Sequence, residues 1–275
     1  MGWQNWQNKA KELFAICTIT LLSILLPLSF LLLARLSCYS YLLSLVGSEP
    51  TQPPLNNFFI FSLFLYGNPA ILYFLVSIFS IVTLLHALTG KITILTESSG
   101  EFHRPRLYTA WILLCTLQVC VGLGIEGTIT AGIDGYSFDT GIHTLLSRVI
   151  FFLGLHETML YWCRMVVKPV VDDTIFGVAK EEKWVQRVAV AMSFGGLWWW
   201  RLRDEVESLV IVAESKREIS VGIAVGDFLG WWLYYVTVTI GMIRIVKGLM
   251  WIFMILLCTR ARRNSNEPCE IVDKV

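Results

Sequence analysis

The chain has 275 residues, of which 55% are hydrophobic and only 16% are charged. An ordinary soluble domain carries about 25% charged residues, so the composition argues against a soluble globular protein and points to lipid. The net charge of +1 indicates no nucleic-acid partner, and the seven cysteines follow no disulfide or metal-ligand spacing.

Four apolar stretches are long enough to cross a bilayer as helices. The first, Leu13 to Ala34, is free of charge and longer than the core of a signal peptide, so we interpret it as an uncleaved span. A proline-rich loop follows it. The other three spans are expected from Pro69 to Leu88, from Leu107 to Gly127 and from Ile142 to Val167.

The last third of the chain is less regular. Val185 to Trp200 is apolar but short, and it ends in three tryptophans, so it predicts either a short span or a helix in the headgroup region. Arg201 to Glu218 is densely charged and is expected in water. Ile219 to Ile243 predicts a further span, after which Arg244 and Lys247 interrupt the apolar pattern before the run Leu249 to Cys258.

The fold class that follows is all-α, an integral membrane helical bundle with four clear spans and one or two further spans or interfacial helices. We divide the chain into a four-span bundle (1–168), a C-terminal region with a charged amphipathic segment (169–258) and a short basic, then polar, tail (259–275). The expected partner of such a bundle is the lipid bilayer.

Lysine and arginine near the span ends predict the orientation. They gather at the N-terminus, in the second loop and after the fourth span, which places the N-terminus in the cytoplasm, and only Arg35 disagrees. If the basic cluster Arg260 to Arg263 is also cytoplasmic, the chain crosses six times, with Val185 to Trp200 as the fifth span. In the alternative, Val185 to Glu218 stays on the cytoplasmic surface and only four or five helices cross.

Ionisable residues inside the spans are candidate functional residues. The fourth span carries Arg148, His156 and Glu157, and Gln118 and Glu126 share one face of the third span. Since these two spans are antiparallel neighbours, we expect Glu126 to pair with Arg148. The cluster predicts either a proton or ion relay or interhelical hydrogen bonds that hold the bundle together, and we favour the second.

Asp227 lies in the last long span and needs a cationic partner. Arg187 and Arg148 are the candidates, unless the span starts later and leaves Asp227 at the membrane surface.

A glycine ridge marks the same span. Gly222, Gly226 and Gly230 recur every four residues, a small-residue pattern that lets helix backbones approach closely. The ridge predicts packing within the chain, or a homo- or hetero-oligomer through this face; we favour packing within the chain.

No cofactor, metal or enzyme chemistry is predicted. His156-Glu157 begins like a zinc-protease motif, but Leu160 stands where the second histidine is required. Haem needs histidines paired across helices, and the four present do not match in depth. No nucleophile lies beside a base.

The length, the four spans and the tryptophan-rich charged C-terminal third resemble the plant-specific small multi-pass transmembrane proteins, a group that includes four-span stigma proteins of interspecific pollen rejection. The resemblance implies a protein of the plasma membrane, or of the endoplasmic reticulum or another endomembrane, that acts by association. The first functional hypothesis is therefore association with other membrane proteins in recognition, signalling or trafficking. The alternative is a small-solute or ion transporter or channel that uses the polar residues of the third and fourth spans.

Overall fold

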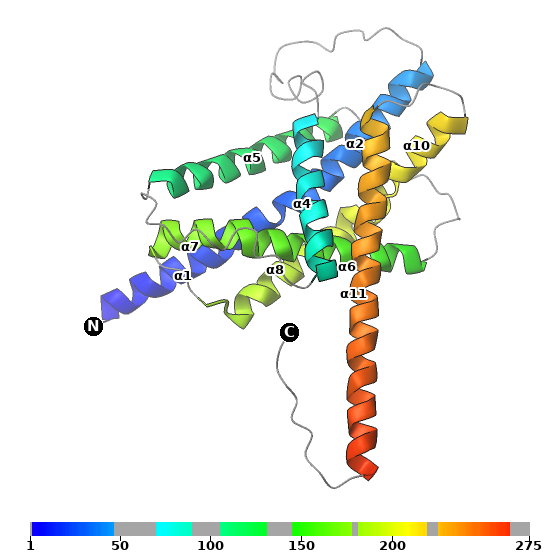
Figure 1. Ribbon diagram of the computed structural model, residues 1–275. Helices are drawn as coiled ribbons and strands as arrows, with labels where there is room; N and C mark the ends of the chain where they lie inside the picture. Colours follow the sequence, from blue (N-terminus) through cyan, green and yellow to red (C-terminus); the bar gives the residue numbers. More distant parts are fainter. Residues whose placement is uncertain are drawn as a thin grey trace.

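The computed structural model describes residues 2–46, 70–89, 105–130, 145–177, 181–218 and 225–264, and every regular element within these ranges is a helix (Figure 1). Five helical stretches are long and apolar enough to cross a membrane: Trp6–Leu42, Leu72–Thr89, Tyr108–Ile129, Leu146–Phe176 and Val225–Arg260. The protein is therefore an all-helical multi-pass membrane protein, as the composition predicts.

The first span is a long rod with one break. Helix α1 (Gly2–Ser23) and helix α2 (Leu25–Val46) are separated only by Ile24. The break lies just before Pro27, which has no N–H to donate to the backbone carbonyl one turn earlier. The indole of Trp162 donates a hydrogen bond of 3.0 Å to the carbonyl oxygen of Leu22. A side chain from a neighbouring helix thus supplies a hydrogen bond to the backbone next to the break.

The next two helices confirm the second and third predicted spans to within three residues at each end. They are α4 (Ala70–Thr89) and α5 (Pro105–Thr130).

The fourth span is longer than predicted. Helix α6 (Leu145–Trp162) continues through a π-helical turn, η1 (Cys163–Val167), into α7 (Lys168–Phe176). The turn ends two residues before Pro169, which a helix interior accommodates only by shifting its hydrogen bonds. The segment ends at Gly177, whose φ of 69° and 3.0 Å hydrogen bond to Asp173 form a left-handed cap.

The region after Lys183 forms a second continuous helical segment. Helix α8 (Trp184–Leu197) runs through the π-helical turn η2 (Trp198–Leu202) into α9 (Arg203–Glu205), and a turn leads to α10 (Ser208–Glu218). We call α8, η2 and α9 together the α8–α9 segment.

The last helix corrects the prediction of two apolar runs interrupted by charge. Helix α11 (Val225–Asn264) is one helix of 40 residues, about 60 Å long. Arg244 and Lys247 do not break it, because both are good helix formers and a salt bridge holds Arg244 to Glu157.

The bundle core lies around α6, which packs on α2 and α11 and contacts α8 through Phe194. Its largest buried side chains include Phe30, Phe151, Leu155 and Met159. Helix α11 packs on α6 and α4, α10 lies between α2 and α11, and α1 contacts α7 and α8. In Figure 1 the second half of α11 extends away from the other helices.

Helices α6 and α11 cross backbone to backbone. A Cβ atom added to Gly154 would lie 1.9 Å from the carbonyl oxygen of Thr237, and one added to Gly241 would lie 2.0 Å from that of Ile150. Only glycine fits at either position, so this pair of glycines sets the closest approach between the two helices.

Candidate functional site

Buried ion pairs join the charged segment 203–218 to the spans around it. Arg35 of α2 makes a two-point ion pair with Glu205 of α9, with distances of 2.5 Å and 2.8 Å between nitrogen and oxygen. The Arg35 guanidinium also donates a 3.1 Å hydrogen bond to the hydroxyl of Thr128 on α5. Both charged side chains are almost fully buried. Arg35, which disagreed with the orientation rule, therefore has a partner inside the bundle.

Arg148 makes the second ion pair, and its partner is not the predicted one. Its guanidinium donates two hydrogen bonds, of 2.6 Å and 2.9 Å, to the carboxylate of Glu207. Asp204 lies 3.9 Å from the same guanidinium. The expected pair with Glu126 is wrong: Glu126 is exposed on α5, and Glu207, two residues after Glu205, takes its place.

The third ion pair satisfies Asp227. The Lys216 amine of α10 donates a 2.8 Å hydrogen bond to the Asp227 carboxylate and another of 3.1 Å to the hydroxyl of Ser40. Arg187 and Arg148, the expected partners, pair with Glu182 and Glu207 instead.

Three charged residues of the segment Arg201 to Glu218 are thus inside the bundle, which corrects the expectation that this segment lies wholly in water. Glu205, Glu207 and Lys216 are each at most 6% exposed, and the apolar run from Leu209 to Val212 is buried beside them. A charge removed from water is tolerated when an opposite charge and further hydrogen bonds face it. Each of the three has such a partner, on α2, α6 and α11 respectively.

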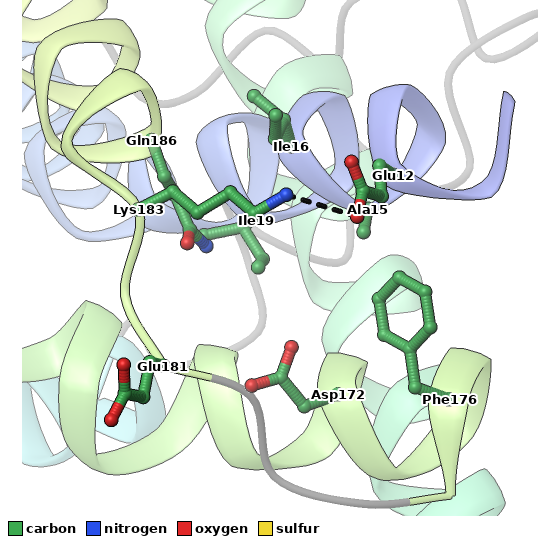
Figure 2. Close-up of a pocket in the computed structure, with 9 residues that line it drawn as sticks. All are labelled: Glu12, Ala15, Ile16, Ile19, Asp172, Phe176, Glu181, Lys183 and Gln186. Atoms are coloured by element: carbon green, nitrogen blue, oxygen red, sulfur yellow. Dashed lines mark ion pairs between the residues drawn. The ribbon is translucent and has the colours of Figure 1, made fainter. Parts of the chain in front are cut away.

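Another ion pair lies at the opposite end of the first span. The Lys183 amine is 2.9 Å from the carboxylate of Glu12, as the dashed line in Figure 2 shows. The two residues border a small, open pocket of about 30 Å³, which is lined by α1, α7 and the residues around the start of α8. Asp172 and Gln186 also line it, and both are buried.

The two ends together align the α8–α9 segment with the first span. Glu12 and Arg35 are separated by about 34 Å of helix, and Lys183 and Glu205 by about 33 Å. Since Lys183 pairs with Glu12 and Glu205 with Arg35, the segment runs parallel to α1 and α2 over the same length. The contacts agree, because α8 packs on α1 and α9 packs on α2.

Tryptophans mark both ends of this segment. Trp184 is 73% exposed at its start, and Trp199 and Trp200 are 73% and 77% exposed near its end. Between them, Val185, Val188 and Met192 present apolar surface. Exposed tryptophan at each end of an apolar helix is typical of the two membrane interfaces.

The other predicted polar residues have separate surroundings. His156 stacks with Phe152 and lies against Phe194, and Glu157 forms a 3.0 Å salt bridge with Arg244 of α11. The side-chain oxygen of Gln118 is buried and accepts no hydrogen bond from the described residues. Arg148, His156 and Glu157 thus share α6 without sharing partners.

The glycine ridge packs within the chain where the structure describes it. Gly226 faces Tyr73 of α4, and Gly230 faces Tyr73 and Leu209. Gly230 is buried by these side chains, and Gly226 is partly covered. Gly222 lies outside the described residues.

Sequence reasoning missed Glu205, Glu207 and Lys216 because a dense run of mixed charge is usually solvated. Arg35 is the one sequence feature that points to a buried acid. It is a cation near the end of an apolar span, and such a position is explained by an acidic partner inside the bundle. The sequence also gives no sign of the close pair Gly154 and Gly241, because neither glycine belongs to a repeated small-residue pattern.

Comparison of the chain with models of known families, with curated proteins and with solved structures finds no match. Within the described ranges, no three histidine, cysteine, aspartate or glutamate side chains are placed to hold a metal ion. Among the described residues, most of the buried charged side chains of the bundle pair with one another.

Proposed function

We propose that this multi-pass membrane protein acts by association with other membrane proteins, in recognition, signalling or trafficking, and not by catalysis. One observation carries the proposal: the second half of α11 is apolar and exposed on all sides. From Val246 to Leu257 its large hydrophobic side chains are 39–65% exposed, and only 11% of the most apolar stretch of α11 is buried. An apolar helix that leaves its own bundle offers surface to a neighbouring membrane protein.

We further propose six crossings, with both ends of the chain in the cytoplasm. The alignment of the α8–α9 segment with the first span supports this, as do the tryptophans at its two ends. If the α8–α9 segment crosses the membrane, the chain passes from the cytoplasmic side, where Glu12 lies, to the outer side, where Arg35 lies. Helix α11 then crosses back to the cytoplasmic side. The basic cluster after α11 then lies on the cytoplasmic side, in keeping with the positive-inside rule.

Transport is the less favoured function, because two of the charged residues that would line a path have fixed partners. Arg148 is held by Glu207, and Glu157 by Arg244. A relay residue must change its charge state or its partner during each cycle.

We propose that the protein lies in the plasma membrane, with an endomembrane as the alternative. We also propose that it belongs to the plant-specific group of small multi-pass transmembrane proteins that the sequence resembles. The small connections between the spans favour a role inside the membrane over one in a large external domain.

Photo-cross-linking in intact membranes tests the association. A photoreactive amino acid replaces Phe253, which is 61% exposed, and in a matched control it replaces Tyr234, which is 4% exposed on the same helix. We expect a discrete protein adduct of higher mass from position 253 and none from position 234. Adducts with lipid alone at position 253 would contradict the proposal.

A flux assay separates the two functions. If the purified protein in vesicles conducts a solute and Glu157→Gln abolishes the flux while the protein stays folded, transport replaces association as the function.

A further inference from the structure

Two arginines share one acid at the end of the bundle where α8 begins. Arg164 lies in the π-helical turn η1, and Arg187 lies in the first turn of α8. Their Nε atoms are 3.6 Å and 3.1 Å, respectively, from the same carboxylate oxygen of Glu182. Because both nitrogens face one oxygen, the two guanidinium groups lie side by side. One carboxylate balances only one of them, so the group of three keeps an excess of positive charge.

The two guanidinium groups retain most of their capacity to donate hydrogen bonds. Arg35 and Arg148 each donate two hydrogen bonds to a carboxylate. Neither Arg164 nor Arg187 donates one to a residue in the described ranges, where each contacts Glu182 only as an ion pair. The two side chains are 51% and 59% exposed, and the Glu182 side chain beneath them is 17% exposed. The N–H groups are therefore open to a ligand from outside.

An exposed tryptophan and an apolar surface adjoin the two arginines. Trp184 lies one turn before Arg187 on the same side of α8, and its side chain is largely exposed. Val188 follows Arg187 directly, and Met192 lies one turn beyond Val188, so both continue an exposed apolar surface along the helix. Tryptophan and arginine beside an apolar helix surface are typical of the membrane–water interface.

We propose that Arg164 and Arg187 together bind the phosphate of an anionic phospholipid, whose acyl chains lie along Val188 and Met192. Guanidinium suits this ligand, because its planar N–H groups match pairs of phosphate oxygens. The headgroup's negative charge balances the positive charge that Glu182 leaves over. A soluble phosphate has the same chemistry, but only a lipid also covers the apolar surface of α8.

Native mass spectrometry of the full-length protein tests the site. The protein in detergent is titrated with phosphatidylglycerol or with phosphatidylcholine of the same acyl chains, and the lipid-bound fraction is measured. We expect phosphatidylglycerol to bind about tenfold more tightly than phosphatidylcholine. Arg164→Gln and Arg187→Gln should each lower the affinity for phosphatidylglycerol about fivefold.

The matched control is Arg203→Gln. Arg203 is also an exposed arginine in an ion pair, but it lies at the other end of the α8–α9 segment, so its loss should leave the preference unchanged. Equal binding of the two lipids by the natural protein would overturn the proposal. So would an equal loss of preference in Arg203→Gln and in the variants of the site.

Glu182→Gln separates a lipid site from a purely structural contact. If the two arginines receive a phosphate, removing the competing carboxylate should tighten phosphatidylglycerol binding about fivefold. If they serve only to hold Glu182, the same change should leave binding unaltered or weaken it. Unaltered or weaker binding in a Glu182→Gln protein whose thermal unfolding matches that of the natural protein would overturn the proposal.

Glycerol phosphate distinguishes a lipid from a soluble phosphate, because it carries the phosphate without the acyl chains. We expect phosphatidylglycerol to remain bound when glycerol phosphate is added at the same concentration. Displacement of the lipid under these conditions would overturn the assignment to lipid and identify a site for soluble phosphate.

Discussion

Arg35 on α2 and Glu205 on α9 lie 170 positions apart in the sequence and form a two-point ion pair inside the bundle. Both side chains are at least nine-tenths buried, so the pair fixes the end of the α8–α9 segment against the first span. A guanidinium facing a carboxylate through two parallel hydrogen bonds fixes orientation as well as distance.

Removing one member of this pair should be far more harmful than removing both. Arg35→Met leaves the Glu205 carboxylate buried with less compensation, and a loss of about 3–5 kcal/mol in the free energy of unfolding is expected. The double variant Arg35→Met with Glu205→Met removes both charges and should regain most of that loss. Thermal unfolding of the purified proteins in detergent measures all three. Equal losses in the single and double variants would show that the charges do not depend on each other.

The spans were predictable because composition and length decide them. The bounds of α4 and α5 were predicted to within three residues, since only an apolar helix satisfies its backbone in lipid. The burial of α10 was not predictable from its sequence. Its charged residues are stable either in water or inside a bundle in which oppositely charged side chains face them. That choice depends on Arg35, Arg148 and Asp227, which lie far away in sequence.

The ion-pair partners of the candidate site residues could not be predicted from the sequence either. Short loops predict which helices are neighbours, but not which face of each helix is turned inward. Arg148 was expected to face Glu126 across one loop, yet its side chain lies toward Glu207 of a segment much later in the chain. Asp227 needed a cation, as predicted, and Lys216 supplies it.

The geometry of the Arg148 pair should make a lysine a poor substitute. Arg148→Lys keeps the charge but replaces two parallel hydrogen bonds to Glu207 with a single point of contact. We expect a loss of about 1–2 kcal/mol in unfolding free energy.

The control for this substitution is Arg203→Lys. Arg203 pairs with its neighbour Asp204 and lies over the ring of the exposed Trp199, and Arg203 and Asp204 are both more than a third exposed, so the change should stay within about 0.5 kcal/mol. The same thermal unfolding assay compares the two, and equal effects would argue against a special role for the Arg148 geometry.

Glycine at the crossing of α6 and α11 allows a second comparison. Gly241→Ala places a methyl group against the carbonyl of Ile150, so the helices must move apart, at a cost of about 1–3 kcal/mol or more. Gly248→Ala changes the same helix where nothing lies within 4 Å of the added carbon, and alanine is the better helix former there. We expect Gly241→Ala to unfold at lower temperature and Gly248→Ala to match the natural protein or exceed it. The opposite order would contradict the close crossing.

The crossing of the membrane by the α8–α9 segment is the central claim, and cysteine accessibility in intact cells tests it most directly. On a background without native cysteines, single cysteines replace Glu181 before α8, Glu214 in α10 and Arg260 near the end of α11, which are all exposed. The account predicts labelling from outside at position 214 alone, with positions 181 and 260 labelled only after the membrane is made permeable. Labelling of positions 181 and 214 from the same side would contradict it, because α8 would then not cross.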